Sequence, residues 1–321
     1  MRPLASPAAL DAATPGDRDR YLDLLRALAL AVVVFGHWLT AVVWVDGDGL
    51  HASTLLERLP ASRWATWVVQ IMPVFFLVGG VVNARSWRSV LARGGDWPTW
   101  VRARATRLLR PVLPLLWVWA VLCAGLAAAG LDPALVRQGS LAALVALWFI
   151  AVYLLVIAAT PAALAMHARA GRWSPAVPVA LGVAAAGVDV AHLAGVGVVG
   201  FANFFLVWAA VHQLGICWGD GFLQGPRAQG SKAPWVLLGG GLGVLIVLVG
   251  WGGYPASMVG VDGLRSNTFP PSVALVALGF AQAGVVLAVA DGARRRLASP
   301  RLWRGVIAVN LVAMTVYLWH S

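Results

Sequence analysis

The sequence predicts an all-α fold, a polytopic transmembrane helix bundle, and three observations lead to it. Hydrophobic residues make up 60% of the 321 residues and charged residues only 12%, and the mean hydropathy is +0.79. These values differ strongly from those of a soluble domain. The apolar residues fall in runs near the ~20 residues that a helix needs to cross a bilayer. Nearly all Lys and Arg residues lie between these runs.

Nine segments are apolar and long enough to be membrane spans. They are 22–45, 65–82, 111–130, 141–164, 175–192, 198–217, 235–252, 272–290 and 305–321. We expect residues 1–20 to form a mobile cytoplasmic tail and residues 21–321 to form one membrane domain. Because the last segment stops without a helix-ending signal, we expect that domain to be incomplete at its C-terminus.

The positive charges predict the orientation of the chain. Nineteen of the 24 Lys and Arg residues fall in alternate connecting segments, which predicts a multi-pass protein of the plasma membrane with a cytoplasmic N-terminus. The same bias accounts for the net charge of +11 without a nucleic-acid partner. The residues on the expected cytoplasmic side are Arg2, Arg18, Arg20, Arg85, Arg88, Arg93, Arg102, Arg104, Arg107, Arg110, Arg169, Arg172, Arg227, Lys232, Arg294, Arg295, Arg296, Arg301 and Arg304.

The first span carries two ionisable residues, Arg26 and His37. At ~100° per residue a separation of 11 residues returns to nearly the same helix face, roughly 16 Å further along the axis. An ionisable group inside a span is costly unless it faces a cavity or a partner, so we interpret His37 as functional. His320, in the last span, should reach a similar depth and could face the same cavity.

Other patterns favour packing over chemistry. Cys123 and Cys217 lie in apolar runs, so neither a disulfide framework nor a metal site is expected. The G-x-G-x-x-G at 195–200 has no strand before it, which argues against a dinucleotide site. Gly239 to Gly241 and Gly243 are expected to allow close helix packing. The polar residues expected to hold helices together are His212, Gln213, Gln70, Asn203 and Asn310.

Four motifs together resemble the acyltransferase-3 family of integral membrane acyltransferases. Their order and spacing carry the likeness from about Tyr21 to the end. They are the Arg-x10-His pair of Arg26 and His37 after Leu22 and Asp23, MPVFFLVGG at Met72 to Gly80, RLLRPVLP at Arg107 to Pro114, and YLWH at Tyr317 to His320. The chain departs from the pattern after Leu147 and Trp148, where many members have a downstream glutamate and this chain reads LWFIAVYLL.

The resemblance implies transfer of an acyl group from cytoplasmic acyl-CoA, expected to be acetyl-CoA, to a hydroxyl of a carbohydrate, envelope component or secondary metabolite. Acyl-CoA would be a substrate, with no bound cofactor, and membrane lipid would surround the protein. A histidine suits the removal of a hydroxyl proton, so His37 is the expected general base. His320 is the second expected catalytic residue. Arg26, Arg107 and Arg110 are expected to bind the donor phosphates.

Alternatives remain for several of these residues. Arg107 and Arg110 could simply supply positive charge at a helix entrance. His320 and Trp148 could be packing residues. For the whole chain, the alternative is a secondary transporter or exporter that uses His37 and Arg26 for proton coupling or anion recognition. A transporter is expected to contain paired half-repeats, and no internal duplication is evident in the sequence.

Overall fold

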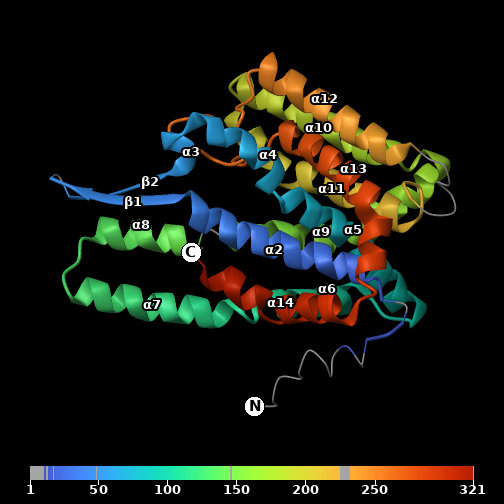
Figure 1. Ribbon diagram of the computed structural model, residues 1–321, viewed down its shortest axis with the longest axis horizontal. Coiled ribbons are helices and arrows are strands. Elements are labelled where there is room, and N and C mark those ends of the chain that lie inside the picture. Colours follow the sequence, from blue (N-terminus) through green and yellow to red (C-terminus); the bar gives the residue numbers. More distant parts are fainter. Residues whose placement is uncertain are drawn as a thin grey trace.

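The computed structural model describes residues 11, 14–16, 18–47, 49–144, 147–224 and 232–320. Most of its helices run alongside one another in a bundle, as Figure 1 shows. The elements are α2 (Arg20–Thr40), β1 (Ala41–Asp46), β2 (Gly49–Thr54), α3 (Leu55–Arg58), η1 (Pro60–Ala65), α4 (Thr66–Val69), α5 (Met72–Ala92), α6 (Trp97–Leu109), α7 (Val112–Ala128), α8 (Pro133–Leu144), α9 (Leu147–Ala170), η2 (Gly171–Trp173), α10 (Ala176–Leu193), η3 (Gly197–Ala202), α11 (Asn203–Gly219), α12 (Ala233–Gly250), α13 (Val273–Arg296) and α14 (Pro300–Trp319).

The predicted polytopic helix bundle is confirmed. Among the described residues, 8 helical segments are long and apolar enough to cross a membrane. A ninth is obtained if α6 and α7, which meet at a bend of 43°, count as one broken span. The chain is therefore a multi-pass membrane protein.

The predicted first span, 22–45, is too long at its C-terminal end. Helix α2 ends at Thr40, and residues 41–46 form β1, which pairs with β2 in an antiparallel hairpin. Hydropathy counts valine as apolar in either conformation, but the β-branched Val42, Val43 and Val45 favour a strand. The hairpin projects from the bundle beyond the end of α2 (Figure 1).

Another predicted span contains a break that hydropathy does not detect. The span over 65–82 is divided between α4, which ends at Val69, and α5, which begins at Met72. Pro73 lies in the first turn of α5, where a missing N–H costs no hydrogen bond. The span predicted over 141–164 corresponds to a candidate span over Leu147–Trp173 among the described residues.

Helices α5 and α11 form the centre of the bundle and approach each other at glycines. A Cβ on Gly80 would collide with the carbonyl oxygen of His212, and one on Gly215 with that of Leu77. Helix α2 lies against α14 and α5. Helices α10, α12 and α13 cover the opposite side of the centre (Figure 1).

The expected packing role of the glycines in α12 is correct at one position. A Cβ on Gly241 would lie 2.5 Å from the backbone nitrogen of Ala281 in α13. A Cβ added to Gly239 or Gly243 would meet no other atom within 4 Å. Sequence therefore identified the tightly packed helix, while the structure identifies the residue at the crossing.

Four of the five polar residues expected to join helices do so, because a hydrogen bond between spans removes the cost of an unpaired polar group in lipid. The pairs are His212 with Asn83, Gln213 with His167, Asn203 with Asp189, and Asn310 with the carbonyl of Asp23. Gln70 instead donates to the carbonyl of Met258 in the loop over 251–272. Asp189 also accepts from the hydroxyl of Tyr254 at 2.8 Å. That bond fastens the loop over 251–272 to α10.

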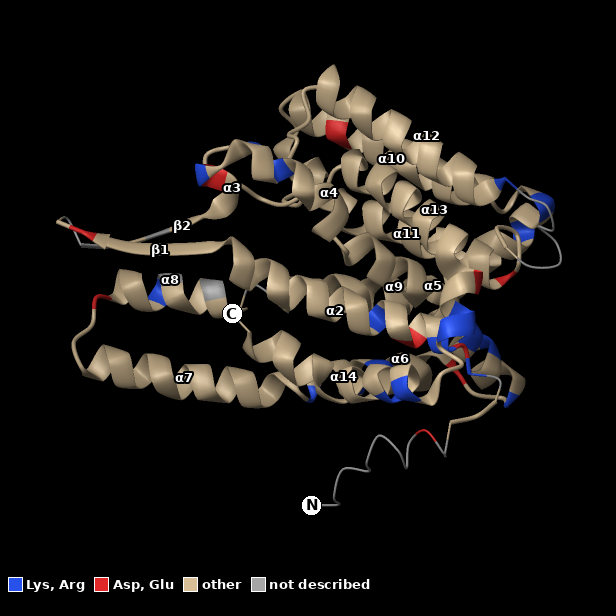
Figure 2. Ribbon diagram, viewed as in Figure 1, with Lys and Arg blue, Asp and Glu red and all other residues tan. Residues whose placement is uncertain are grey.

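Positive charge gathers at one end of the bundle, where α2 and α14 begin (Figure 2). We call this the arginine-rich end. The tail expected over residues 1–20 lies largely outside the described residues, although Asp11 forms an ion pair with Arg304 at 3.1 Å. The residues of the arginine-rich end include Arg20 at the start of α2, Arg294, Arg295 and Arg296 in the last turn of α13, and Arg301 and Arg304 near the start of α14.

The α5–α11 crossing yields a stability prediction. Gly80→Ala should destabilise the protein by about 1–3 kcal/mol, because overpacking outweighs the gain from replacing a helical glycine. The measurement is the free energy of unfolding in a detergent titration. Gly243→Ala is the matched control and should be neutral or slightly stabilising, since its added methyl group meets open space. Equal effects of the two substitutions would contradict the packing at Gly80.

Candidate functional site

His37 and His320 meet although they lie in the first and last spans. Nδ1 of His37 is 2.9 Å from Nε2 of His320, and the ring centroids are 4.9 Å apart. His37 is in the last turn of α2, and His320 is the C-cap residue of α14. The packing of α2 on α14 brings them together, and Trp38 donates to the carbonyl of His320 at 2.8 Å.

The hydrogen bonds of the pair assign the protons. Nδ1 of His320 lies 2.6 Å from the carbonyl oxygen of Tyr317, and a carbonyl only accepts, so this nitrogen carries the hydrogen. Nε2 of a neutral His320 therefore accepts the hydrogen on Nδ1 of His37. Consequently Nε2 of His37 is the unprotonated nitrogen of its ring, and it has no partner among the described residues.

His37 lines a cavity of about 450 Å³, which we call the histidine cavity. Its walls combine aromatic rings, including Trp148, with several hydroxyl groups and one amide. The lining residues are Val32, Val33, Gly36, His37, Thr40, Thr54, Leu56, Thr66, Val69, Gln70, Met72, Trp148, Phe149, Phe204, Val259, Gly260, Thr268, Phe269 and Tyr317. Several belong to the segments that connect spans at the end of the bundle away from the arginine-rich end (Figure 1).

Hydrogen bonds hold the 251–272 loop against the helices beside this cavity. The hydroxyl of Thr66 accepts from the backbone N–H of Met258 at 2.8 Å, and the side chain of Gln70 donates to its carbonyl at 3.1 Å. Burial, then the neighbouring Asp189, raises the pKa of Tyr254 above its ordinary value. The Tyr254 hydroxyl therefore remains a hydrogen-bond donor to Asp189, which keeps the loop in place.

Arg26 lines a second, smaller cavity of about 130 Å³, which we call the arginine cavity. Three guanidinium groups from two elements face it, those of Arg26, Arg104 and Arg107. The remaining lining residues are Phe75, Val78, Gly79, Val82, Leu108, Tyr153 and Ile157, so none of the described residues that line it carries a carboxylate. Converging guanidinium groups without a carboxylate are suited to bind a phosphate or another anion.

Comparison with known proteins gives a family match. A family model described as an acyltransferase domain, that of the acyltransferase-3 family, matches residues 19–321. The chain belongs to this family. The acyltransferase matches no curated protein and no solved structure. Family membership confirms the resemblance seen in the motifs and identifies the protein as an enzyme that transfers acyl groups.

The structure brings together some of the five arginine and histidine motif residues of this acyltransferase and separates others. Arg26 and Arg107 share the arginine cavity, and His37 contacts His320. Arg110 is exposed, does not line the arginine cavity, and is the C-cap of α6 immediately before the bend into α7. Helix α6 ends at Leu109, so Arg107 lies within the helix and Arg110 lies just beyond its last residue.

Arg104 was not predicted as a site residue, and the structure places it in the arginine cavity. Its Nη1 donates to Oδ1 of Asn83 at 3.2 Å, which orients the guanidinium from the α5 side. Arg104 precedes Arg107 by three residues on α6, so helical periodicity alone would place the two side by side. In the sequence Arg104 was counted only among the positive charges of a connecting segment.

Asp23 forms its close ion pair with Arg18 and not with Arg26. Its carboxylate is 2.6 Å from Nε of Arg18 and 3.9 Å from Nη1 of Arg26. Asp19 is the N-cap of α2 and accepts from the backbone N–H of Tyr21. The weak contact with Asp23 leaves Arg26 able to bind an anion in the arginine cavity.

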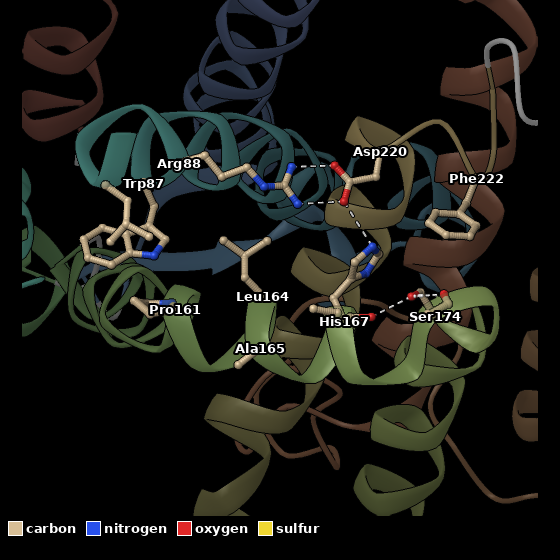
Figure 3. Close-up of a pocket in the computed structure, with 12 residues that line it drawn as sticks. Trp87, Arg88, Pro161, Leu164, Ala165, His167, Ser174, Asp220 and Phe222 are labelled. Carbon is tan, nitrogen blue, oxygen red and sulfur yellow. Dashed lines mark hydrogen bonds and ion pairs between the residues drawn. The ribbon is translucent and has the colours of Figure 1, made fainter. Parts of the chain in front are cut away.

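A third cavity, about 630 Å³, lies beside the ends of α5, α9 and α11 (Figure 3). Asp220 accepts from both terminal nitrogens of Arg88, at 2.5 and 2.7 Å, and lies 3.1 Å from Nε2 of His167. Arg88, His167 and Asp220 thus bind one another and hold the ends of α5, α9 and α11 together. Sequence analysis did not predict this cluster, because Arg88 and Asp220 are separated by 132 residues.

Proposed function

We propose that the acyltransferase moves an acyl group from acyl-CoA to a hydroxyl group of an acceptor, with His37 as general base. The donor would bind at the arginine cavity from the arginine-rich end, which we assign to the cytoplasm on the basis of the positive-inside rule. The acceptor would bind in the histidine cavity. The donor would be acetyl-CoA or another short acyl-CoA.

One observation carries this proposal: the same three helices line both cavities in the same order. On α2, Arg26 lines the arginine cavity and His37 the histidine cavity. On α5 the sequence of lining residues runs from Met72 at the histidine cavity to Val82 at the arginine cavity. On α9 it runs from Trp148 and Phe149 to Tyr153 and Ile157. The two cavities therefore follow one another along a shared axis.

The proton arrangement of the histidine pair supports the role of His37. The acceptor oxygen would attack the thioester carbonyl while Nε2 of His37 takes the hydroxyl proton. Collapse of the tetrahedral intermediate breaks the carbon–sulfur bond, and His37 returns the proton to the departing thiolate. During the intermediate the imidazolium of His37 keeps its Nδ1 hydrogen bond to His320, which orients the ring and disperses its charge.

The arginine cavity would hold the anionic part of the donor. Acyl-CoA carries its phosphates at the end of a long pantetheine arm, so a phosphate site some distance from the base is the expected arrangement. Arg26 and His37 are separated by roughly 16 Å along α2. Bidentate contacts from Arg104 and Arg107 would add orientation to the charge attraction.

The histidine cavity fits a polar acceptor such as a carbohydrate. Aromatic rings such as Trp148 and Phe269 offer surfaces for the apolar face of a sugar, and side chains such as Thr40 and Gln70 offer hydrogen bonds. An envelope component would reach this cavity from the end opposite the arginine-rich end. A secondary metabolite with a hydroxyl group remains within the same chemistry.

The first prediction concerns the base. His37→Ala should lower the rate of acyl transfer by at least ~10²-fold, because a positioned base contributes about 10²–10⁴-fold. The measurement is label transfer from acetyl-CoA and longer acyl-CoAs in membranes containing the protein. His192→Ala is the control, since His192 lies outside the histidine cavity. Transport of an unmodified substrate without acyl transfer would favour the transporter alternative and overturn the proposal.

The second prediction concerns His320, which acts through His37. His320→Ala should reduce kcat while leaving KM for acyl-CoA unchanged, because it removes the acceptor of the Nδ1 hydrogen bond. His320→Gln should recover part of the rate, since its amide oxygen can accept the same hydrogen. A fall in kcat that is equal in both variants would show that His320 only packs against α2.

The third prediction compares arginines that line the arginine cavity with one that does not. Arg104→Ala and Arg107→Ala should each raise KM for acyl-CoA about tenfold or more, because each removes a charge-assisted hydrogen bond worth ~1.5–3 kcal/mol. Arg110→Ala should have a much smaller effect, since Arg110 does not line the cavity. An effect of Arg110→Ala as large as that of Arg107→Ala would place the donor along the α6 surface instead.

A further inference from the structure

The arginine cavity and the histidine cavity have no lining residue in common. The proposed reaction nevertheless requires the acyl end of the donor to pass from the first to the second. Something between the two cavities must therefore move, and the side chains at their junction indicate what it is.

Three aromatic rings from two helices occupy this junction. Phe75 and Tyr153 line the arginine cavity, and Phe149 lines the histidine cavity. Each ring contacts the other two: the centroids are 4.9 Å apart for Phe75 and Phe149, 5.1 Å for Phe75 and Tyr153, and 5.6 Å for Phe149 and Tyr153. These mutual contacts form a wall between the cavities, and Phe76 supports it from α5 through edge-on contacts with Phe149 and Tyr153.

The two helices hold the rings in different ways. Phe149 and Tyr153 are four residues apart on α9, so they lie on one face and stack with their planes 18° apart. Phe75, on α5, meets both edge-on, at 84° and 72°. A Cβ on Gly79 would be only 3.0 Å from the Tyr153 ring, so Tyr153 is seated where α5 has no side chain.

Phe75 is the ring with most freedom to move. Phe149 and Tyr153 are buried, with 5% and 8% of their surface exposed, whereas Phe75 is half-buried. Tyr153 is also confined by Gly79 and by its stack with Phe149. Because Phe75 is the more exposed ring and meets the other two edge-on, rotation of its side chain would open the wall without moving a helix.

We propose that Phe75, Phe149 and Tyr153 form an aromatic gate that the pantetheine arm of the donor displaces to bring the thioester to His37. In its closed position the gate separates the two ends of the protein and prevents a continuous polar path across the membrane. The identity of the passing group rests on the proposed function, whereas the gate itself rests on the contacts among the rings.

The test measures access through the gate with a reporter cysteine. Val33, which lines the histidine cavity, would be changed to cysteine in a Cys123→Ser background. A small charged methanethiosulfonate reagent would be applied to sealed vesicles from the arginine-rich end. With Phe75 present, labelling from this end should be slow. With Phe75→Ala, it should be at least tenfold faster.

Trp87→Ala is the matched control for loosening of the bundle. Trp87 is on the same helix α5, packs against Trp100 at 5.3 Å and lines neither the arginine cavity nor the histidine cavity. Its loss should leave labelling from the arginine-rich end slow. An unchanged rate in Phe75→Ala, or an equal acceleration in Trp87→Ala, would overturn the gate. Labelling from the opposite end should be the same in all variants, which verifies that the cysteine and the fold are intact.

The labelling requires neither donor nor catalysis, so its outcome is distinct from that of the proposed function. Faster labelling in Phe75→Ala together with an absence of acyl transfer in the parent protein would retain the gate and reject the proposed reaction. Transfer in the parent with no change in labelling would retain the reaction and reject the gate.

Discussion

The hydrogen bond between His37 and His320 joins the beginning and the end of the membrane domain. Each imidazole would be costly to place alone in a span, and each supplies what the other lacks, since one nitrogen donates and the other accepts. The carbonyl of Tyr317 accepts the hydrogen on Nδ1 of His320, which makes His320 the acceptor and His37 the donor in this pair. The same contact that satisfies two polar groups therefore also leaves one basic nitrogen on a cavity wall, so the stability of the helix pairing and the proposed chemistry depend on one proton arrangement.

At the arginine-rich end, the pairing of charged side chains is the corresponding constraint. Several arginines there form ion pairs, as in the contact of Arg294 with Asp19 and that of Arg304 with Asp11. The arginine cavity is different, because three guanidinium groups line it without a carboxylate. Like charges in a confined space repel one another, and an anionic ligand would relieve that repulsion. An anion at this site would therefore bring together α2 and α6.

Sequence reasoning succeeded where the information is local and failed where it depends on distant contacts. The spans and the common face of Arg26 and His37 follow from hydropathy and from 3.6-residue periodicity. The hairpin after Thr40 was missed because hydropathy treats Val42 to Val45 alike in helix and strand. The cluster of Arg88 with Asp220 and the contact of Phe75 with Phe149 join residues that no repeat or spacing relates. The pairing of His37 with His320 was accessible because their depths in the membrane could be compared.

The two cavities also explain why aromatic residues concentrate along α9. A channel lined throughout by polar groups would connect the two ends of a membrane protein, whereas a channel closed by aliphatic packing would exclude the donor. Aromatic rings combine the two requirements, because they pack as apolar groups when in contact and pivot as rigid plates about two bonds. Tyr153 lines the arginine cavity and Phe149 lines the histidine cavity. Aromatic lining thus continues along α9 across the junction of the two cavities, which suits passage of the arm of the proposed donor without a standing polar path.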